Sequence, residues 1–185
     1  KQGRAFPNMA LIDSDQHIPH FKKLVNAIHR ENGKIVIQVN HAGRQTSSSF
    51  TGSPIVAPSA LPCPVRKEMP KELTPEEIRE IVQAYGEAAR RVKEAGADGV
   101  EIHMAHGYLL NQFLSPFSNQ RTDEYGGNLD RRMKMAIEVL RAVRNQVGPD
   151  FTVICRLSAD EYVEGGLKID ASKEIAKALE RNGAD

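Results

Sequence analysis

The sequence is poor in the features that mark several large classes of protein. It contains no tryptophan, and its two cysteines, Cys63 and Cys155, lie far apart in the 185 residues. Two isolated thiols make neither a disulfide framework nor a metal cluster, so we expect a reducing, cytoplasmic setting. The formal net charge of +1 gives no electrostatic reason to bind nucleic acid or an anionic membrane. No apolar run approaches the ~20 residues that span a bilayer, and no signal-peptide pattern opens the chain.

What the sequence does contain is an alternation of helical and strand patterns. Apolar residues recur at helical spacing over residues 14–32, 74–95, roughly 130–147, and 170–182. Short β-branched runs at residues 35–40, 99–104 and 151–158 are typical of buried strands. Thr74 suits the N-cap of the second helix, and Glu77 completes a capping box with it. Residues 41–73 and 105–129 interrupt the rhythm and are predicted as long loops, which in a compact domain are usually functional or disordered.

Repeated βα units predict an α/β fold with a parallel sheet, either doubly wound or closed into a (β/α)8 TIM barrel. No Gly-x-Gly-x-x-Gly follows a strand, which disfavours a dinucleotide-binding half. A barrel has eight strands in about 250 residues, and this chain offers three, so we expect part of one. The chain starts with Lys1, and residues 183–185 repeat the Gly-Ala-Asp that precedes an earlier strand. We therefore expect residues 1–185 to be the central part of a longer barrel domain, with units missing on both sides.

Each predicted strand carries a polar residue in its C-terminal half, and these are Gln38, His103 and Arg156. Active sites of βα barrels lie at the carboxyl ends of the strands, so all three should line one mouth. Each residue alone is more often a structural hydrogen-bonding group, but three on successive strands favour a shared ligand. An amide, an imidazole and a guanidinium suit a flat heterocycle rich in carbonyls, such as the pyrimidine ring of a flavin.

His103 and His106 are three residues apart, and Tyr108 follows closely. A phenol, with a reference pKa of about 10, stays protonated at neutral pH and can donate a proton to a developing carbanion. Two imidazoles beside it could donate hydrogen bonds to a carbonyl oxygen and stabilise an enolate. Two other interpretations stay open at this point. The histidines could bind a metal with His41 or Glu101 as the third ligand, or one could be structural and the other merely exposed.

Three segments of the sequence resemble the old yellow enzyme family of flavin oxidoreductases. Residues 106–127 (HGYLLNQFLSPFSNQRTDEYGG) are similar to the family signature, residues 38–44 (QVNHAGR) to its strand-three motif and residues 156–159 (RLSA) to its strand-five motif. The similarity covers essentially the whole chain in the right order. Residues 56–59, 62–64 and 68–74 look most like the long members, which are the 2-enoate reductases, 2,4-dienoyl-CoA reductases and bile-acid-type oxidoreductases.

The resemblance implies an FMN-dependent ene-reductase that uses NAD(P)H to reduce activated C=C bonds of small enones or enoates. It implies that Gln38 and Arg156 contact the FMN ring and that His103 and His106 hold the substrate carbonyl. Tyr108 would then give a proton to the α-carbon, while reduced FMN gives hydride to the β-carbon. The paired histidines fit the enoate-reductase branch better than the dienoyl-CoA reductase branch. Long members also carry FAD and a 4Fe-4S cluster, and this chain holds no group of cysteines that could bind the iron–sulfur cluster.

The chain departs from the family pattern at Arg131, where the family usually has asparagine, although Arg132 keeps the matching arginine. This loop-to-helix region is expected to be structural, with Arg121 and Asp123 paired inside the loop.

Two alternatives to the flavin enzyme remain. One is a metal-dependent barrel enzyme that uses His41, His103 and His106. The other is an inactive structural fragment, whose open sheet edges would invite pairing between copies and hence a homo-oligomer.

Overall fold

The computed structural model describes residues 2–185 and contains the predicted parallel sheet. Its strands are β1 (Val36–Val39), β4 (Gly99–Met104) and β5 (Thr152–Leu157), in the order β1-β4-β5. Gln38 stands beside Glu101 across the first pair, and His103 stands beside Arg156 across the second. All three expected strands are therefore confirmed, and their carboxyl ends lie at one edge of the sheet.

Four longer helices accompany the strands, namely α1 (Ile18–Arg30), α3 (Pro75–Glu94), α5 (Leu129–Val147) and α6 (Ile169–Arg181). The first begins four residues later than predicted, because Ser14 caps a separate 3-10 turn, η1 (Asp15–His17). At the start of α3 the capping box is present: the Glu77 amide donates to Thr74 Oγ1 at 3.3 Å, and the Thr74 amide donates to Glu77 Oε2 at 3.0 Å. The polar groups at this helix end thus have local partners.

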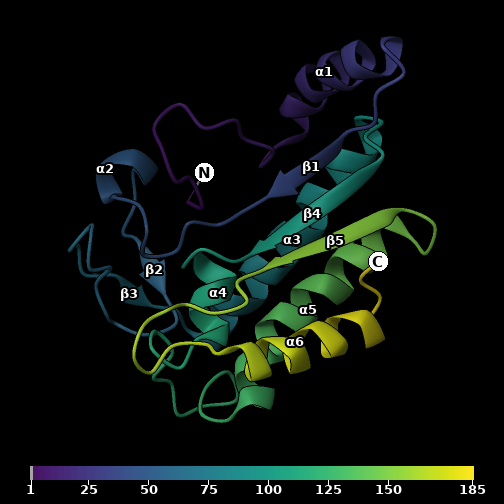
Figure 1. The fold of residues 1–185 in the computed structure, drawn as a ribbon. Coiled ribbons are helices and arrows are strands. Elements are labelled where there is room, and N and C mark those ends of the chain that lie inside the picture. Colours follow the sequence, from purple (N-terminus) through teal and green to yellow (C-terminus); the bar gives the residue numbers. More distant parts are fainter. Residues whose placement is uncertain (1) are drawn as a thin grey trace.

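The two faces of the sheet differ in what covers them. Figure 1 shows α3 and α5 behind the three strands, and their apolar residues join Ile37, Val100 and Val153 in one buried core. Each such fully buried aliphatic side chain stabilises the fold by roughly 1.5–3 kcal/mol. On the opposite face Val36 is 41% exposed, and Gln38 and Arg156 are also exposed. In a closed barrel this second face points to the interior, so the polar residues lie on the side where a barrel holds its ligand.

Neither of the two stretches predicted as loops is wholly irregular. Residues 41–73 contain α2 (Ser48–Thr51) and a parallel pair of two-residue strands, β2 (Val56–Ala57) and β3 (Lys71–Glu72). Residues 105–129 contain α4 (Leu109–Leu114), whose six residues are all buried. The loop prediction was wrong at α4 because a helix buried on every side has no polar face, and so its sequence shows no amphipathic period.

The predicted pair of Arg121 and Asp123 is confirmed, and Arg121 reaches further than expected. Its Nη2 lies 2.5 Å from Asp123 Oδ2, while Nη1 donates to the carbonyl oxygens of Pro58 at 2.8 Å and Leu73 at 2.6 Å. The guanidinium therefore ties the segment after α4 to the segment that carries β2 and β3. A buried arginine can be accommodated when its donors are satisfied in this way.

Among the helices of residues 2–185, none combines the length and the apolar character that crossing a membrane would require.

Replacing Thr74 by alanine removes the side-chain oxygen that caps α3. We expect the free energy of unfolding to fall by about 1 kcal/mol, the usual cost of losing a serine or threonine N-cap. Urea unfolding of the Thr74→Ala protein would measure it. Thr74→Ser retains the oxygen and should stay close to wild type, and an equal loss in both variants would contradict the capping role.

Candidate active site

The polar residues at the carboxyl ends of the strands lie in two neighbouring layers. In the lower layer the Gln38 Nε2 donates to Glu101 Oε1, a partner that the sequence alone does not reveal. In the upper layer His103 stands beside Arg156. Gln38 and Arg156 are exposed, because residues 2–185 leave this face of the sheet open, while His103 is 4% exposed. The structure thus brings the three predicted strand residues to one edge.

His103 is held as a neutral imidazole. The Ala105 amide donates to its Nδ1 at 3.2 Å, so Nδ1 carries no proton and the neutral ring has its N–H at Nε2. Burial, together with the positive charge that His106 can carry and the nearby Arg156, lowers the pKa of His103 from 6.5 to about 4. At neutral pH, His103 is therefore a hydrogen-bond donor through Nε2 without being a cation.

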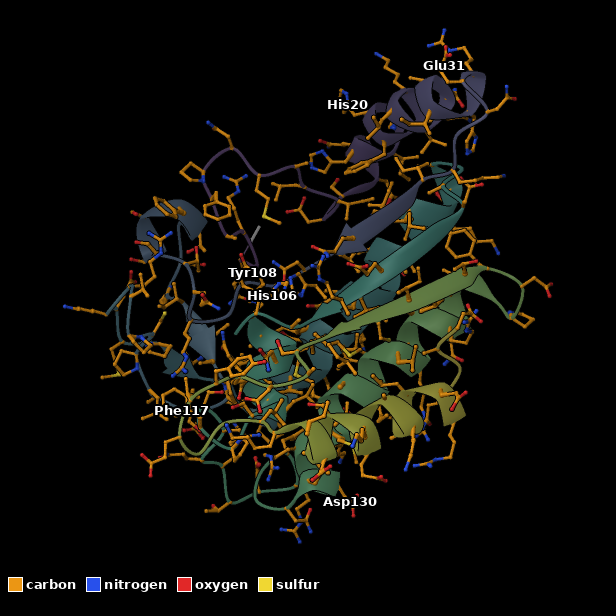
Figure 2. All side chains as sticks on the ribbon, in the orientation of Figure 1. His20, Glu31, His106, Tyr108, Phe117 and Asp130 are labelled. Carbon is orange, nitrogen blue, oxygen red and sulfur yellow. The ribbon has the colours of Figure 1, made fainter. Side chains whose placement is uncertain are left out.

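His106 and Tyr108, the other two predicted residues, both contact the His103 ring. Its Nε2 is 3.3 Å from His106 Nδ1, and the two rings meet edge to face with centroids 5.0 Å apart. The Tyr108 ring approaches His103 at the same centroid distance and at an interplanar angle of 90°. Figure 2 shows His106 and Tyr108 next to each other beyond the end of the sheet. Because His106 is exposed and Tyr108 half-buried, both polar tips can reach a bound molecule.

The backbone between these residues has an uncommon conformation. His106 has φ +59° and Gly107 has φ +71°, so two successive residues are left-handed. Glycine adopts this region freely, whereas histidine does so at a cost. Strained backbone of this kind persists only where the surroundings fix it, and it clusters at functional sites.

A cavity of about 390 Å³ opens beside His106. It is bounded by the segments that follow β1, β4 and β5, and its wall includes Arg44, Cys63, Phe117 and Ser158. Glu161 also lines it, but its carboxylate already accepts hydrogen bonds from Asn111, Ser115 and the Leu167 amide. The cavity therefore extends the site away from the sheet without adding a free carboxylate at Glu161.

The arrangement does not support the metal-binding alternative. Within residues 2–185, no group of three histidine, cysteine, aspartate or glutamate side chains is placed to hold a metal ion. His41, the proposed third ligand, is 8% exposed, and its Nδ1 accepts a hydrogen bond from the Gly43 amide at 3.1 Å. Burial lowers the pKa of His41 to about 4, which makes it a neutral residue of the interior.

The exposed donors fit the flavin that the resemblance implies. A flavin pyrimidine ring presents carbonyl oxygens and ring nitrogens, which an amide and a guanidinium can meet with hydrogen bonds. Gln38 and Arg156 offer these groups on one face of the sheet, on strands that flank His103. The same residues on the helix-covered face would meet only apolar side chains. The donor set and its placement are therefore compatible with a flavin ring.

The comparisons with known proteins give the chain its family. The sequence profile of the NADH:flavin oxidoreductase / NADH oxidase family matches residues 1–184. An NADH oxidase of Thermoanaerobacter brockii is 45% identical over 183 residues, which is 98% of this chain and 28% of that protein. An NADPH dehydrogenase of Geobacillus sp. (strain WCH70) is 42% identical over 185 residues, all of this chain and 53% of that protein.

Solved structures of the same kind share the fold. A 2-naphthoyl-CoA reductase in complex with 2-naphthoyl-CoA superposes with a TM-score of 0.93 at 34% identity, covering 99% of this chain and 30% of that one. Morphinone reductase in complex with tetrahydroNAD gives a TM-score of 0.90 at 32% identity, covering 99% and 56%. The chain thus spans between 28% and 56% of the length of these relatives. Its three-stranded sheet is part of a (β/α)8 barrel, and the chain belongs to the NADH:flavin oxidoreductase / NADH oxidase family, the family of the old yellow enzymes.

Proposed function

We propose that the whole protein is an FMN-dependent ene-reductase that uses NAD(P)H to reduce activated C=C bonds of enones or enoates. The observation that carries the proposal is the cluster of His103, His106 and Tyr108 at the strand edge that also holds Gln38 and Arg156. Two hydrogen-bonding imidazoles and a phenol beside two flavin-directed donors are the groups that this reduction requires.

Gln38 and Arg156 would hold the flavin ring from the ends of the two outer strands. The Arg156 guanidinium would lie near the negative charge that builds up on a reduced ring and would stabilise it. When bound, reduced FMN supplies the hydride for the β-carbon of the alkene. The site of the FMN phosphate is not assigned to any residue of this chain.

His103 and His106 would bind the carbonyl oxygen that activates the alkene. His103 has its proton at Nε2, which lies 3.3 Å from His106 Nδ1. A substrate oxygen would take the place of that nitrogen as the acceptor of the His103 proton, and an N–H of His106 would donate to the same oxygen as it gains enolate charge. Tyr108 would deliver its phenolic proton to the α-carbon.

Further properties of the whole protein are part of the same proposal. They are a cytoplasmic setting, a homo-oligomer, and the 4Fe-4S cluster and FAD of the long family members. The cluster and the FAD would be bound by segments outside residues 2–185.

The purified full-length protein should be yellow and should release about one FMN per chain on denaturation. Gln38 and Arg156 are the residues expected to retain the ring. Absorbance and chromatography of the released flavin would measure it. A colourless full-length protein that carries stoichiometric zinc would refute the flavin proposal.

Tyr108→Phe should slow reoxidation of the reduced flavin by 2-cyclohexen-1-one by about 10²–10⁴, because it removes a positioned general acid. Flavin reduction by NAD(P)H should change little, since that step needs no proton from the phenol. Stopped-flow absorbance follows both half-reactions separately. Tyr162→Phe is the matched control, because Tyr162 is 91% exposed. An equal fall in both half-reactions would show that Tyr108 is not the proton donor.

Acid should destabilise the site through His103. Its folded pKa of about 4 lies below the unfolded value of about 6.5, so the unfolded chain binds more protons between these values. The contribution of His103 to the free energy of unfolding is complete above pH 6.5 and is lost as the pH falls toward 4. Between pH 7 and pH 5 the free energy of unfolding should therefore fall by about 2 kcal/mol. Urea unfolding of wild type and His103→Asn at both pH values would test it, because asparagine keeps an acceptor but does not titrate. An identical pH dependence of both proteins would contradict the neutral state of His103.

A further inference from the structure

The left-handed turn at His106 and Gly107 is held in an unusual way. Its two residues have two N–H groups and two carbonyl oxygens, and each of the four makes a hydrogen bond to a side chain from elsewhere in the chain. Most backbone groups form their hydrogen bonds with other backbone groups. Here the partners are the side chains of Gln45, Asn111, Gln112 and Ser158, which we call the turn clamp.

The two N–H groups of the turn are bound by residues that follow β4 and β5. The His106 amide donates to Ser158 Oγ at 3.0 Å, and Ser158 comes directly after β5. The Gly107 amide donates to Asn111 Oδ1 at 2.6 Å. Asn111 is itself fixed, because its Nδ2 donates to Glu161 Oε1 at 3.1 Å.

The two carbonyl oxygens of the turn are bound by glutamines. Gln45, in the segment after β1, donates from Nε2 to the His106 oxygen at 2.5 Å. Gln112, in α4, donates from Nε2 to the Gly107 oxygen at 2.6 Å and to the Ala42 oxygen at 3.2 Å. Its Oε1 also accepts from the Arg44 amide at 3.3 Å. The Gln112 amide therefore binds both segments at once.

The contacts are reciprocal, and two glycines make room for them. A Cβ on Gly107 would come within 2.5 Å of Gln45 Nε2, and a Cβ on Gly43 would come within 2.6 Å of Gln112 Nε2. Both glycines have positive φ, +71° and +58°. Each of the two segments, after β1 and after β4, thus extends a glutamine side chain to the other. The amide of each glutamine lies against a glycine of the opposite segment.

We propose that Gln45, Asn111, Gln112 and Ser158 are positioning residues that set the direction of the His106 imidazole and the place of Tyr108. The inference rests on the proposed function of His106 in binding the substrate carbonyl. None of the four needs to touch the flavin or the alkene for this role. Side chains from three segments fix the strained turn, so removing one contact lets His106 move. A misplacement of about 1 Å in an active site can lower the rate by a factor of about 10².

Gln45 gives the cleanest test because it is only partly buried, whereas Asn111 and Gln112 are each 1% exposed. Gln45→Glu keeps the size of the side chain but places a carboxylate oxygen where the amide donated to the His106 oxygen. Gln45→Ala removes the contact without adding repulsion. Gln83, exposed on α3, provides the matched control as Gln83→Glu.

The experiment uses the full-length holoprotein and two readouts. The first is the rate constant for reoxidation of the reduced flavin by 2-cyclohexen-1-one as a function of its concentration. The second is the dissociation constant of 4-hydroxybenzaldehyde, a carbonyl compound without a reducible alkene, from the change in flavin absorbance. FMN content, the flavin midpoint potential and the melting temperature are recorded for every variant.

We expect Gln45→Glu to lower the second-order rate constant and to weaken 4-hydroxybenzaldehyde binding, each by about tenfold, the loss expected when one hydrogen bond is broken and its acceptor is left unpaired. Gln45→Ala should show a smaller loss of the same kind. FMN content and midpoint potential should stay at wild-type values in both, and Gln83→Glu should match wild type throughout.

The outcomes separate this inference from the proposed function. If His106→Ala loses ligand binding but Gln45→Glu does not, the turn clamp does not position His106, and the proposed function stands. If His106→Ala also binds and reacts like wild type, the proposed function of the histidine fails, and the inference fails with it. If Gln45→Glu loses FMN, Ser158→Ala replaces it and removes the bond to the His106 amide, and a wild-type result there would overturn the inference.

Discussion

The parallel hydrogen bonding of β4 to both β1 and β5 is the constraint on which the site depends. Because the three strands run in the same direction in a fixed register, their carboxyl ends meet, and His103 comes to lie beside Arg156. A slip of one residue would turn every side chain to the other face, where α3 and α5 present an apolar surface. The burial of one face thus fixes both the core and the direction of the polar residues.

The strands alone do not complete the site, because two of its three central residues lie beyond the end of β4. His106 and Tyr108 depend on segments that are tied together by buried polar side chains, above all Gln112 and Arg121. Inside a protein such groups are costly when unpaired and hold their neighbours firmly when paired. Hydrogen bonds of buried polar side chains therefore hold the loops in place, whereas apolar packing holds the sheet.

The electrostatics of the site follow from the same arrangement. His103 is mostly buried near Arg156, and both conditions favour the neutral imidazole. Its proton sits on the nitrogen that faces His106, since the other nitrogen accepts from the Ala105 backbone. A neutral donor can bind a carbonyl oxygen without holding a permanent ion pair. The protonation state that the proposed chemistry needs is thus a consequence of where β4 ends.

The sequence by itself determined the parts of the protein that depend on local spacing. Alternating apolar patterns predicted the three strands and the four longer helices, and the capping box at Thr74 and the pair of Arg121 and Asp123 both involve residues two or three apart. The motifs also pointed to the family. Only the tertiary structure revealed α4, the pairing of β2 with β3, and the exchange of Gln45 and Gln112 between two segments. The physical reason is that these features join residues far apart in the chain or buried on all sides, so no periodicity in the sequence records them.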